Sequence, residues 1–210
     1  MSSQDFNNEL DKLEIQLSLE TIDKLKLYCK ELWDHNSRLN LTRHLDYQTF
    51  VRRDVLDSVQ LASVIKEGEK ILDFGSGGGV PGIVLGILRP DLDITLAEFV
   101  GKKAHVLDLM TRELELPIDI IDDRVENVLD GEGYSSLTAR AVGPLPKMLP
   151  WFKKSWGEFG RMLLIKGPRW TEERKTAEEA GLMDGINIEC LLSYPMPGRD
   201  SESVVLELRR

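Results

Sequence analysis

The stretch Ile71-Leu72-Asp73-Phe74-Gly75-Ser76-Gly77-Gly78-Gly79-Val80-Pro81-Gly82 decides the fold. An apolar segment ends at the acid and breaks into five glycines within eight residues, and a second apolar run then extends from Ile83 to Leu88. Glycine permits positive φ and leaves no Cβ between the main chain and a ligand. Because so many glycines cost considerable chain entropy, we interpret the segment as a strand, a binding loop for a nucleotide-like cofactor, and a helix.

Two readings of this loop compete. Gly77, Gly79 and Gly82 satisfy G-x-G-x-x-G, the pattern of dinucleotide-binding loops. Gly75, Gly77 and Gly79, preceded by Asp73, form D-x-G-x-G-x-G, which resembles motif I of S-adenosylmethionine-dependent methyltransferases. Asp73 favours the second reading, because a carboxylate before the loop is unfavourable beside a pyrophosphate and favourable beside an ammonium and a sulfonium group.

A second acid, Glu98, does not decide between the two cofactors. It closes the apolar stretch 94–97 and follows Gly77 by 21 residues. An acid at this distance accepts hydrogen bonds from the ribose hydroxyls of either cofactor.

Length and composition indicate one sizeable domain with a modest extension. The chain has 210 residues, of which 41% are hydrophobic and 30% are charged. No apolar run approaches the roughly 20 residues that a membrane-spanning helix needs. Cys29 and Cys190 show neither metal-ligand spacing nor a disulfide framework. We therefore expect a cytoplasmic protein, without a metal or a membrane partner, that is a monomer.

The net charge of −9 argues against a general nucleic-acid binder. Basic residues nevertheless outnumber acidic ones in two windows, 36–53 and 147–175. The first window holds Arg38, Arg43, Arg52 and Arg53. These windows are interpreted either as two local basic surfaces on an acidic body or as ordinary solvated helix faces.

The pattern of apolar residues divides the chain into two parts. Residues 1–67 are predicted as a helical extension, with one helix beginning after Ser18 and another over about 47–64. Residues 68–210 alternate between strands and helices, which predicts a mostly parallel sheet covered on both faces. The predicted strands are 70–74, 94–98, 118–121, 137–140, 161–166, 186–193 and 203–208, and the predicted helices between them are 80–88, 101–115, 145–156 and 171–180. Because no helix separates the last two strands, they should form an antiparallel hairpin at one edge.

Charged residues follow several of these strands. Asp73, Glu98, Arg124, Arg140 and Lys166 lie at or just past predicted strand ends. Ligands of open α/β sheets bind at the carboxyl ends of the strands, so these residues should share one site.

With these positions in view, the chain resembles the small-subunit (16S) ribosomal RNA guanine-N7 methyltransferase family, RsmG, formerly called glucose-inhibited division protein B. The resemblance covers about residues 28–170 and rests on six segments in order. They are 33–42 (near W-N-x-x-x-N-L-T), 73–82 (D-x-G-S-G-x-G-x-P-G), 98–103 (an acid, then G-K-[KR]), 124–126 (R-x-E), 138–141 ([ST]-x-R-A) and 166–167 (K-G). The fold it implies is a class I methyltransferase, Rossmann-like α/β fold.

The chain departs from this family at three places. Asp54 stands where the family usually has histidine, and Val80 stands where an aromatic residue or leucine is common. The last strand follows Asp-Ser-Glu-Ser at 200–203 where the family usually has an Arg-His pair. The first and last departures touch expected RNA-facing regions, so they bear on the substrate more than on the cofactor.

The resemblance implies a role for each site residue. The cofactor, S-adenosylmethionine, would be held by Asp73, Gly75, Gly77, Gly79, Val80, Glu98, Val125, Glu126 and Arg140. Arg140 and Lys166 would act at the target base or at a phosphate. Alternatively, Arg124 and Arg140 pair with Glu98 or Glu126, and Trp151 and Trp156 are expected in the core rather than as stacking platforms.

The function that follows is S-adenosylmethionine-dependent methylation of guanine N7 in 16S ribosomal RNA, either as bare RNA or within a small-subunit particle. N7 carries a free lone pair and no proton, so the transfer needs orientation rather than a general base. Two other functions remain open at this point. One is a methyltransferase of the same fold that acts on a small molecule or a protein, and the other is a short NAD(P)-binding oxidoreductase.

Overall fold

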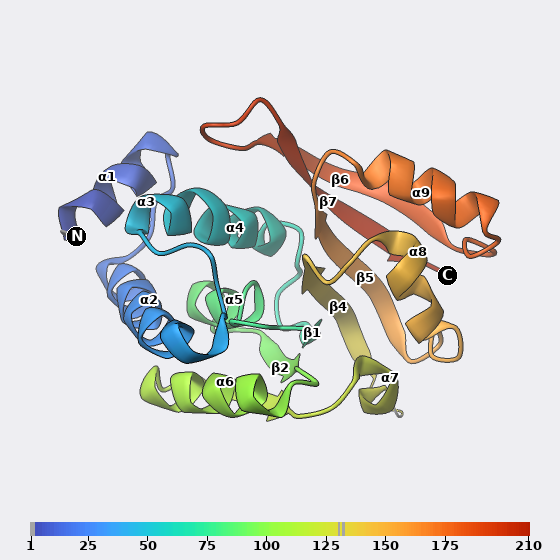
Figure 1. Ribbon diagram of the computed structural model, residues 1–210, viewed down its shortest axis with the longest axis horizontal. Coiled ribbons are helices and arrows are strands. Elements are labelled where there is room, and N and C mark those ends of the chain that lie inside the picture. The colour runs from blue at the N-terminus through green and yellow to red at the C-terminus, as the bar shows by residue number, and fades with distance from the viewer. Residues whose placement is uncertain (1–2, 130, 132) are drawn as a thin grey trace.

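The computed structural model describes residues 3–129, 131 and 133–210, and within them seven strands form one sheet (Figure 1). The strand order is β3-β2-β1-β4-β5-β7-β6. The strands are β1 Lys70–Phe74, β2 Asp93–Ala97, β3 Ile118–Ile121, β4 Tyr134–Arg140, β5 Phe159–Lys166, β6 Asn187–Pro195 and β7 Glu202–Arg209. β1 to β5 pair in parallel, whereas β7 lies antiparallel to both β5 and β6. The mostly parallel sheet with an antiparallel C-terminal hairpin is confirmed.

The helices of the described residues are α1 Ser3–Lys12, α2 Leu19–Leu39, α3 Tyr47–Phe50, α4 Leu56–Ala62, α5 Gly82–Leu88, α6 Gly101–Glu113, α7 Val125–Val128, α8 Leu145–Met148 and α9 Trp170–Glu179. Ser18 caps α2 as expected, because its hydroxyl oxygen accepts a hydrogen bond from the Thr21 amide at 3.1 Å. Asn40 ends the same helix in the left-handed conformation.

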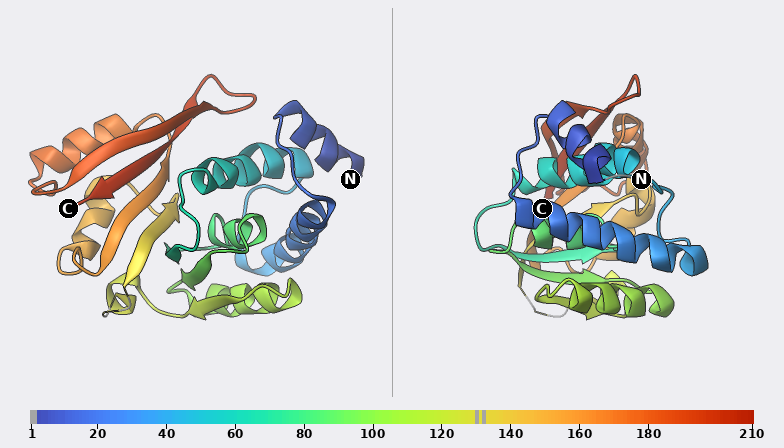
Figure 2. Two further views of the ribbon diagram at one scale, coloured as in Figure 1. Left: turned by 180° about the vertical axis from the view of Figure 1, so that it is seen from behind. Right: turned by 90° about the vertical axis from the view of Figure 1, so that its left-hand side faces the viewer.

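Two hydrophobic clusters cover the two faces of the sheet. Successive side chains of a strand point to opposite faces, so in β1 Ile71 belongs to one cluster while Leu72 and Phe74 belong to the other. The first cluster includes apolar residues of α1, α2 and α4 to α6, and the second includes residues of α7 to α9. The N-terminal helices lie together at one end of the molecule and α9 lies at the other (Figure 2). The division at residue 67 stays a prediction, because residues on both sides of it belong to the first cluster.

Some predicted helices differ from the observed ones. The helix predicted over 145–156 is α8 followed by a 3₁₀ turn, η2 Leu149–Phe152, where Pro150 has no N–H to continue an α-helix. The helix predicted over 47–64 is interrupted by a π-helical turn, η1 Val51–Val55. Such turns insert one residue into the helical ladder and re-aim the side chains around it. α5 begins at Gly82, two residues later than predicted.

Within the described part of the chain, no helix combines the length and the hydropathy that crossing a bilayer requires.

Candidate active site

The glycines of both patterns have structural roles in the loop. Gly75, Gly77 and Gly79 have positive φ values of 63°, 59° and 99°, so the left-handed geometry falls on the glycines of D-x-G-x-G-x-G. Gly82, the last glycine of the other pattern, is required for close packing between α5 and the sheet. A Cβ there would lie 2.2 Å from Cδ2 of Leu96 in β2.

Two side chains from other elements support the loop. The Glu98 carboxylate, at the end of β2, accepts hydrogen bonds from the amides of Gly77 and Val100, both at 2.9 Å. The buried hydroxyl of Tyr28, in α2, donates to the carbonyl of Gly78 at 2.7 Å. The N-terminal helices therefore fix the loop directly. Each oxygen of Glu98 retains a second lone pair that can accept a ribose hydroxyl.

Asp73 is fully buried where β1 meets the loop. Its Oδ1 accepts a hydrogen bond from the Thr138 hydroxyl in β4 at 2.9 Å. Its Oδ2 faces Gly82 at the beginning of α5 and makes no hydrogen bond of regular geometry with any described residue. Burial, opposed by the Thr138 hydrogen bond, raises the pKa of Asp73 to about 7.

An apolar cavity of about 300 Å³ opens beside the loop. Gly75, Val125 and Glu126, all expected to hold the cofactor, line it. The other lining residues are Phe74, Ala97, Phe99, Asp123, Arg124, Val142, Lys147 and Trp151. The Arg124 guanidinium lies 4.9 Å from the centre of the Phe99 ring, which is 57% exposed. These apolar walls fit a flat heteroaromatic ring such as adenine, so the residues present fit the expected cofactor.

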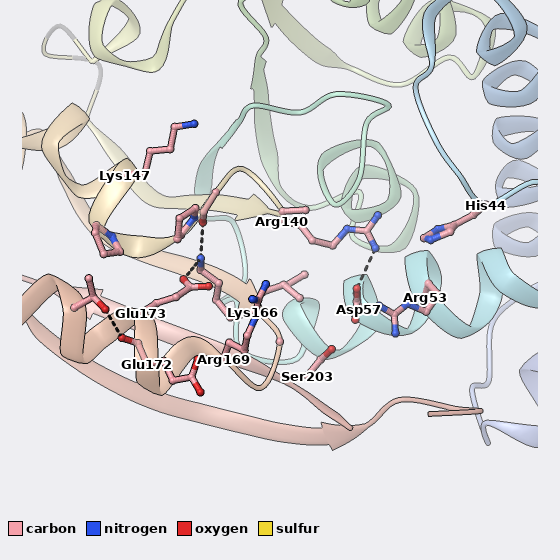
Figure 3. Close-up of a pocket in the computed structure, with 17 residues that line it drawn as sticks. His44, Arg53, Asp57, Arg140, Lys147, Lys166, Arg169, Glu172, Glu173 and Ser203 are labelled. Carbon is pink, nitrogen blue, oxygen red and sulfur yellow. Dashed lines mark hydrogen bonds and ion pairs between the residues drawn. The ribbon is translucent and has the colours of Figure 1, made fainter. Parts of the chain in front are cut away.

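A second, polar cavity of about 1030 Å³ contains Arg140 and Lys166 (Figure 3). Arg140 ends β4 and donates hydrogen bonds to Asp57 Oδ2 at 3.0 Å and to Asp54 Oδ1. The pairing with Glu98 or Glu126 considered for Arg140 is therefore wrong. The partners lie instead in η1 and α4, and of the two acids Asp57 lines the cavity while Asp54 lies behind Arg140. Burial lowers the pKa of Arg140, but the two carboxylates outweigh it and hold that pKa above its usual value.

The two carboxylates have further partners. Nδ1 of His44 lies 2.8 Å from Asp54 Oδ2, and the hydroxyl of Tyr194, in β6, donates to Asp57 Oδ1 at 2.8 Å. An imidazole thus adjoins Asp54, although the chain lacks the usual histidine at that position. Two carboxylates face one guanidinium, so this cluster is negative when His44 is neutral. The sequence assigned no site role to His44 or Asp57 and marked Asp54 only as a departure in an expected RNA-facing region, because nothing local signals contacts between residues so far apart.

Lysines occupy two places around the polar cavity. Lys166, at the end of β5, donates to the Gly143 carbonyl at 2.6 Å and to Glu173 Oε2 at 2.7 Å, so its charge is paired. Lys147, in α8, lines both cavities and marks where they adjoin. Its sequence signals were its place at the beginning of the basic window 147–175 and its position shortly after β4, at the carboxyl edge of the sheet.

The structure thus divides the expected site residues into three groups. Gly75, Val125 and Glu126 line the apolar cavity, and Arg140 and Lys166 line the polar cavity. Asp73, Gly77, Gly79, Val80 and Glu98 line neither of the two; they lie in the loop and at the strand ends beside them.

The two tryptophans differ from each other. Trp156 is buried as expected, whereas Trp151 is half-buried: it packs against the second hydrophobic cluster and also forms a wall of the apolar cavity. Among the described residues, no group of three or more His, Cys, Asp or Glu side chains is arranged to hold a metal ion.

Solved structures share this fold. A TrmK from M. capricolum in complex with S-adenosyl-homocysteine superposes with a TM-score of 0.54 at 16% identity, covering 72% of this chain and 66% of that one. Fibrillarin from Aeropyrum pernix with bound S-adenosyl-L-methionine gives 0.53 at 22% identity, covering 74% and 75%. The fold is that of class I S-adenosylmethionine-dependent methyltransferases.

Sequence comparisons are more specific. The family model GidB, described as rRNA small subunit methyltransferase G, matches residues 21–196. The Ribosomal RNA small subunit methyltransferase G of Rhodopirellula baltica is 42% identical over 196 residues, covering 93% of this chain and 85% of the relative. That of Halorhodospira halophila is 32% identical, covering 91% of each chain. The chain therefore belongs to the rRNA small subunit methyltransferase G family.

Proposed function

We propose that this chain transfers the methyl group of S-adenosylmethionine to N7 of a guanine in small-subunit (16S) ribosomal RNA. The observation that carries the proposal is the pair of adjoining cavities at the carboxyl edge of the sheet, one apolar and one polar, which meet at Lys147. Family membership supports the RNA substrate and the reaction.

In this proposal the apolar cavity holds the adenosine part of the cofactor. Val125 and the Phe99 ring pack against adenine, and Glu98 accepts hydrogen bonds from the ribose hydroxyls. Gly75, Gly77 and Gly79 let the methionine part approach the main chain closely. The cofactor supplies an electrophilic methyl group on a sulfonium.

The polar cavity holds the target guanine in this proposal. N7 is neutral and already carries its lone pair, so the protein need only orient it in line with the methyl group. Methylation moves positive charge onto the base. Asp57, whose buried carboxylate lines this cavity, stabilises that charge, and Arg140 and Tyr194 hold the carboxylate in place.

The test has two stages. S-adenosylhomocysteine and NADH are titrated separately into the purified protein by calorimetry, and we expect only the first to bind. The protein is then incubated with S-adenosylmethionine and either bare 16S RNA or small subunits, and the RNA is digested for mass spectrometry. N7-methylguanosine is the expected product. Methyl transfer to another atom, or only to a small molecule or protein, would overturn the proposal.

We also propose an oligomeric state and a cellular location for the active protein. The presence of both cavities in a single chain supports a monomer as the active form, and an RNA substrate supports a cytoplasmic location. Sedimentation of the protein alone at micromolar concentration should give the mass of one chain.

A further inference from the structure

The polar cavity continues into a smaller recess of about 260 Å³ that contains three arginines. Arg53 comes from η1, Arg169 from the loop between β5 and α9, and Arg199 from the loop between β6 and β7. We call this the arginine recess. Arg53, Arg169 and Ser203 line both the recess and the polar cavity, so the two are continuous.

The three arginines have no direct ionic partner in the described part of the protein. None of them makes an ion pair or a side-chain hydrogen bond with any residue that the structure describes. Neighbouring arginines differ, since Arg52 pairs with Glu9 at 2.6 Å and Arg140 pairs with Asp54 and Asp57. Nε of Arg53 is buried without any partner in the described chain. A buried donor of this kind is unfavourable unless a ligand satisfies it.

The carboxylates beside the recess are engaged elsewhere. Glu173 accepts hydrogen bonds from Lys166 and from the amide of Leu145, at 2.7 and 3.0 Å. Glu202 accepts from the Ser193 hydroxyl at 2.6 Å and keeps its own charge, so three arginines face one uncompensated carboxylate. The recess therefore has an excess of positive charge on a chain whose net charge is −9. Burial lowers the pKa of Arg53, the Asp57 carboxylate opposes this effect, and the nearby guanidinium groups of Arg199 and Arg140 lower it further.

The position of the recess indicates how an RNA strand would pass. The loop between β6 and β7 reaches over α4, and Gly198 in that loop lies close to Arg52 (Figure 1). Three separate segments thus present guanidinium groups beside the cavity proposed for the target base. Guanidinium forks match phosphate oxygens, and contacts to phosphate fix the register of a strand.

We propose that the arginine recess binds the backbone phosphate of a nucleotide next to the target guanine, and so sets which base enters the polar cavity. This inference rests on the proposed function, because it assumes that the cavity receives a base of an RNA strand. It adds a phosphate site built from Arg53, Arg169 and Arg199.

The test uses the variants R169Q and R199Q, with R112Q as the matched control. All three remove one positive charge from an exposed or loop position, and Arg112 lies in α6 where it pairs with Asp108. We expect R169Q and R199Q each to raise the Kd for 16S RNA, and the KM in methyl transfer, by about fivefold or more. The affinity for S-adenosylhomocysteine should stay within about twofold in both variants, the kcat of R199Q should also stay within about twofold because Arg199 lies outside the polar cavity, and R112Q should match the wild type.

The outcomes separate this inference from the proposed function. RNA binding is measured by fluorescence anisotropy and needs no turnover. If the wild type binds RNA but methylates no N7, the proposed function fails while the anisotropy of the variants still tests the recess. R169Q and R199Q that bind RNA like R112Q would overturn the inference. A second result would also overturn it: inorganic pyrophosphate raises the Tm of the wild type but not of R199Q, while R199Q binds RNA as tightly as the wild type. The recess would then hold only small anions.

Discussion

Arg140 acts first as a counter-ion for two buried acids. Its guanidinium is the cationic partner of both Asp54 and Asp57, whose side chains are 1% and 5% exposed. We expect Arg140→Ala to lower the free energy of unfolding by about 3–5 kcal/mol, because it leaves two carboxylates buried without a cation. Urea unfolding measures the loss, and adding Asp54→Asn to the variant should restore part of it.

This expectation changes how an activity assay of Arg140 is interpreted. Loss of methyl transfer in Arg140→Ala would report damage to the cluster together with any direct role at the base. Arg140→Lys keeps the charge and separates the two. An Arg140→Ala protein as stable as the wild type would contradict the counter-ion role.

Asp73 should make stability depend on pH. Its pKa is raised from 3.8 to about 7 in the folded protein by burial. As pH increases from about 4 to 7, the unfolded chain releases this proton before the folded chain does, so stability falls. Between pH 5 and pH 8 the wild type should lose about 2 kcal/mol more than Asp73→Asn, which cannot ionise. Urea unfolding of both proteins at the two pH values checks this, and a constant difference between them would refute it.

At the scale of elements, the glycine loop and the sheet could be predicted from the sequence, whereas the partners of Arg140 could not. Strand and loop patterns are local, and Asp73 to Gly82 carries all of its own signals. The Arg140 contacts join residues 83 and 86 positions apart, and they depend on the π-helical turn η1, which has no sequence signature. For the same reason, the predicted position of Arg140 at a strand end was right but its expected partners were wrong.

The N-terminal helices should be needed for the rest of the chain to fold. Leu25 and Phe50 of this region belong to the same hydrophobic cluster as Ile83 and Leu163, which lie beyond residue 67. Removing residues 1–67 exposes one face of the sheet to water at about 25 cal/mol per Å² of apolar surface. We expect the fragment 68–210 to bind a hydrophobic dye and to show no cooperative thermal transition. A fragment that unfolds cooperatively would instead show that the division at residue 67 separates an independent domain.

At the scale of the whole molecule, an acidic chain that binds RNA should hold few phosphates. The net charge is −9, and the unpaired arginines identified beside the site are Arg53, Arg169 and Arg199. Each phosphate contact on a single strand contributes about −0.7 to the slope of log K against log salt concentration, so three contacts give about −2. The slope is obtained from anisotropy titrations of 16S RNA at salt concentrations from about 50 to 200 mM, a range over which such affinities change strongly.

R199Q should make the slope shallower by about 0.7, because one contact and its released counterion are lost. R112Q should leave it unchanged, since Arg112 is paired with Asp108 on α6, away from the site. A wild-type slope steeper than about −6 would mean that a broad basic surface, rather than a few arginines around the cavity, provides the affinity. In that case the negative charge of the chain would have to be confined to the surfaces that face away from the RNA.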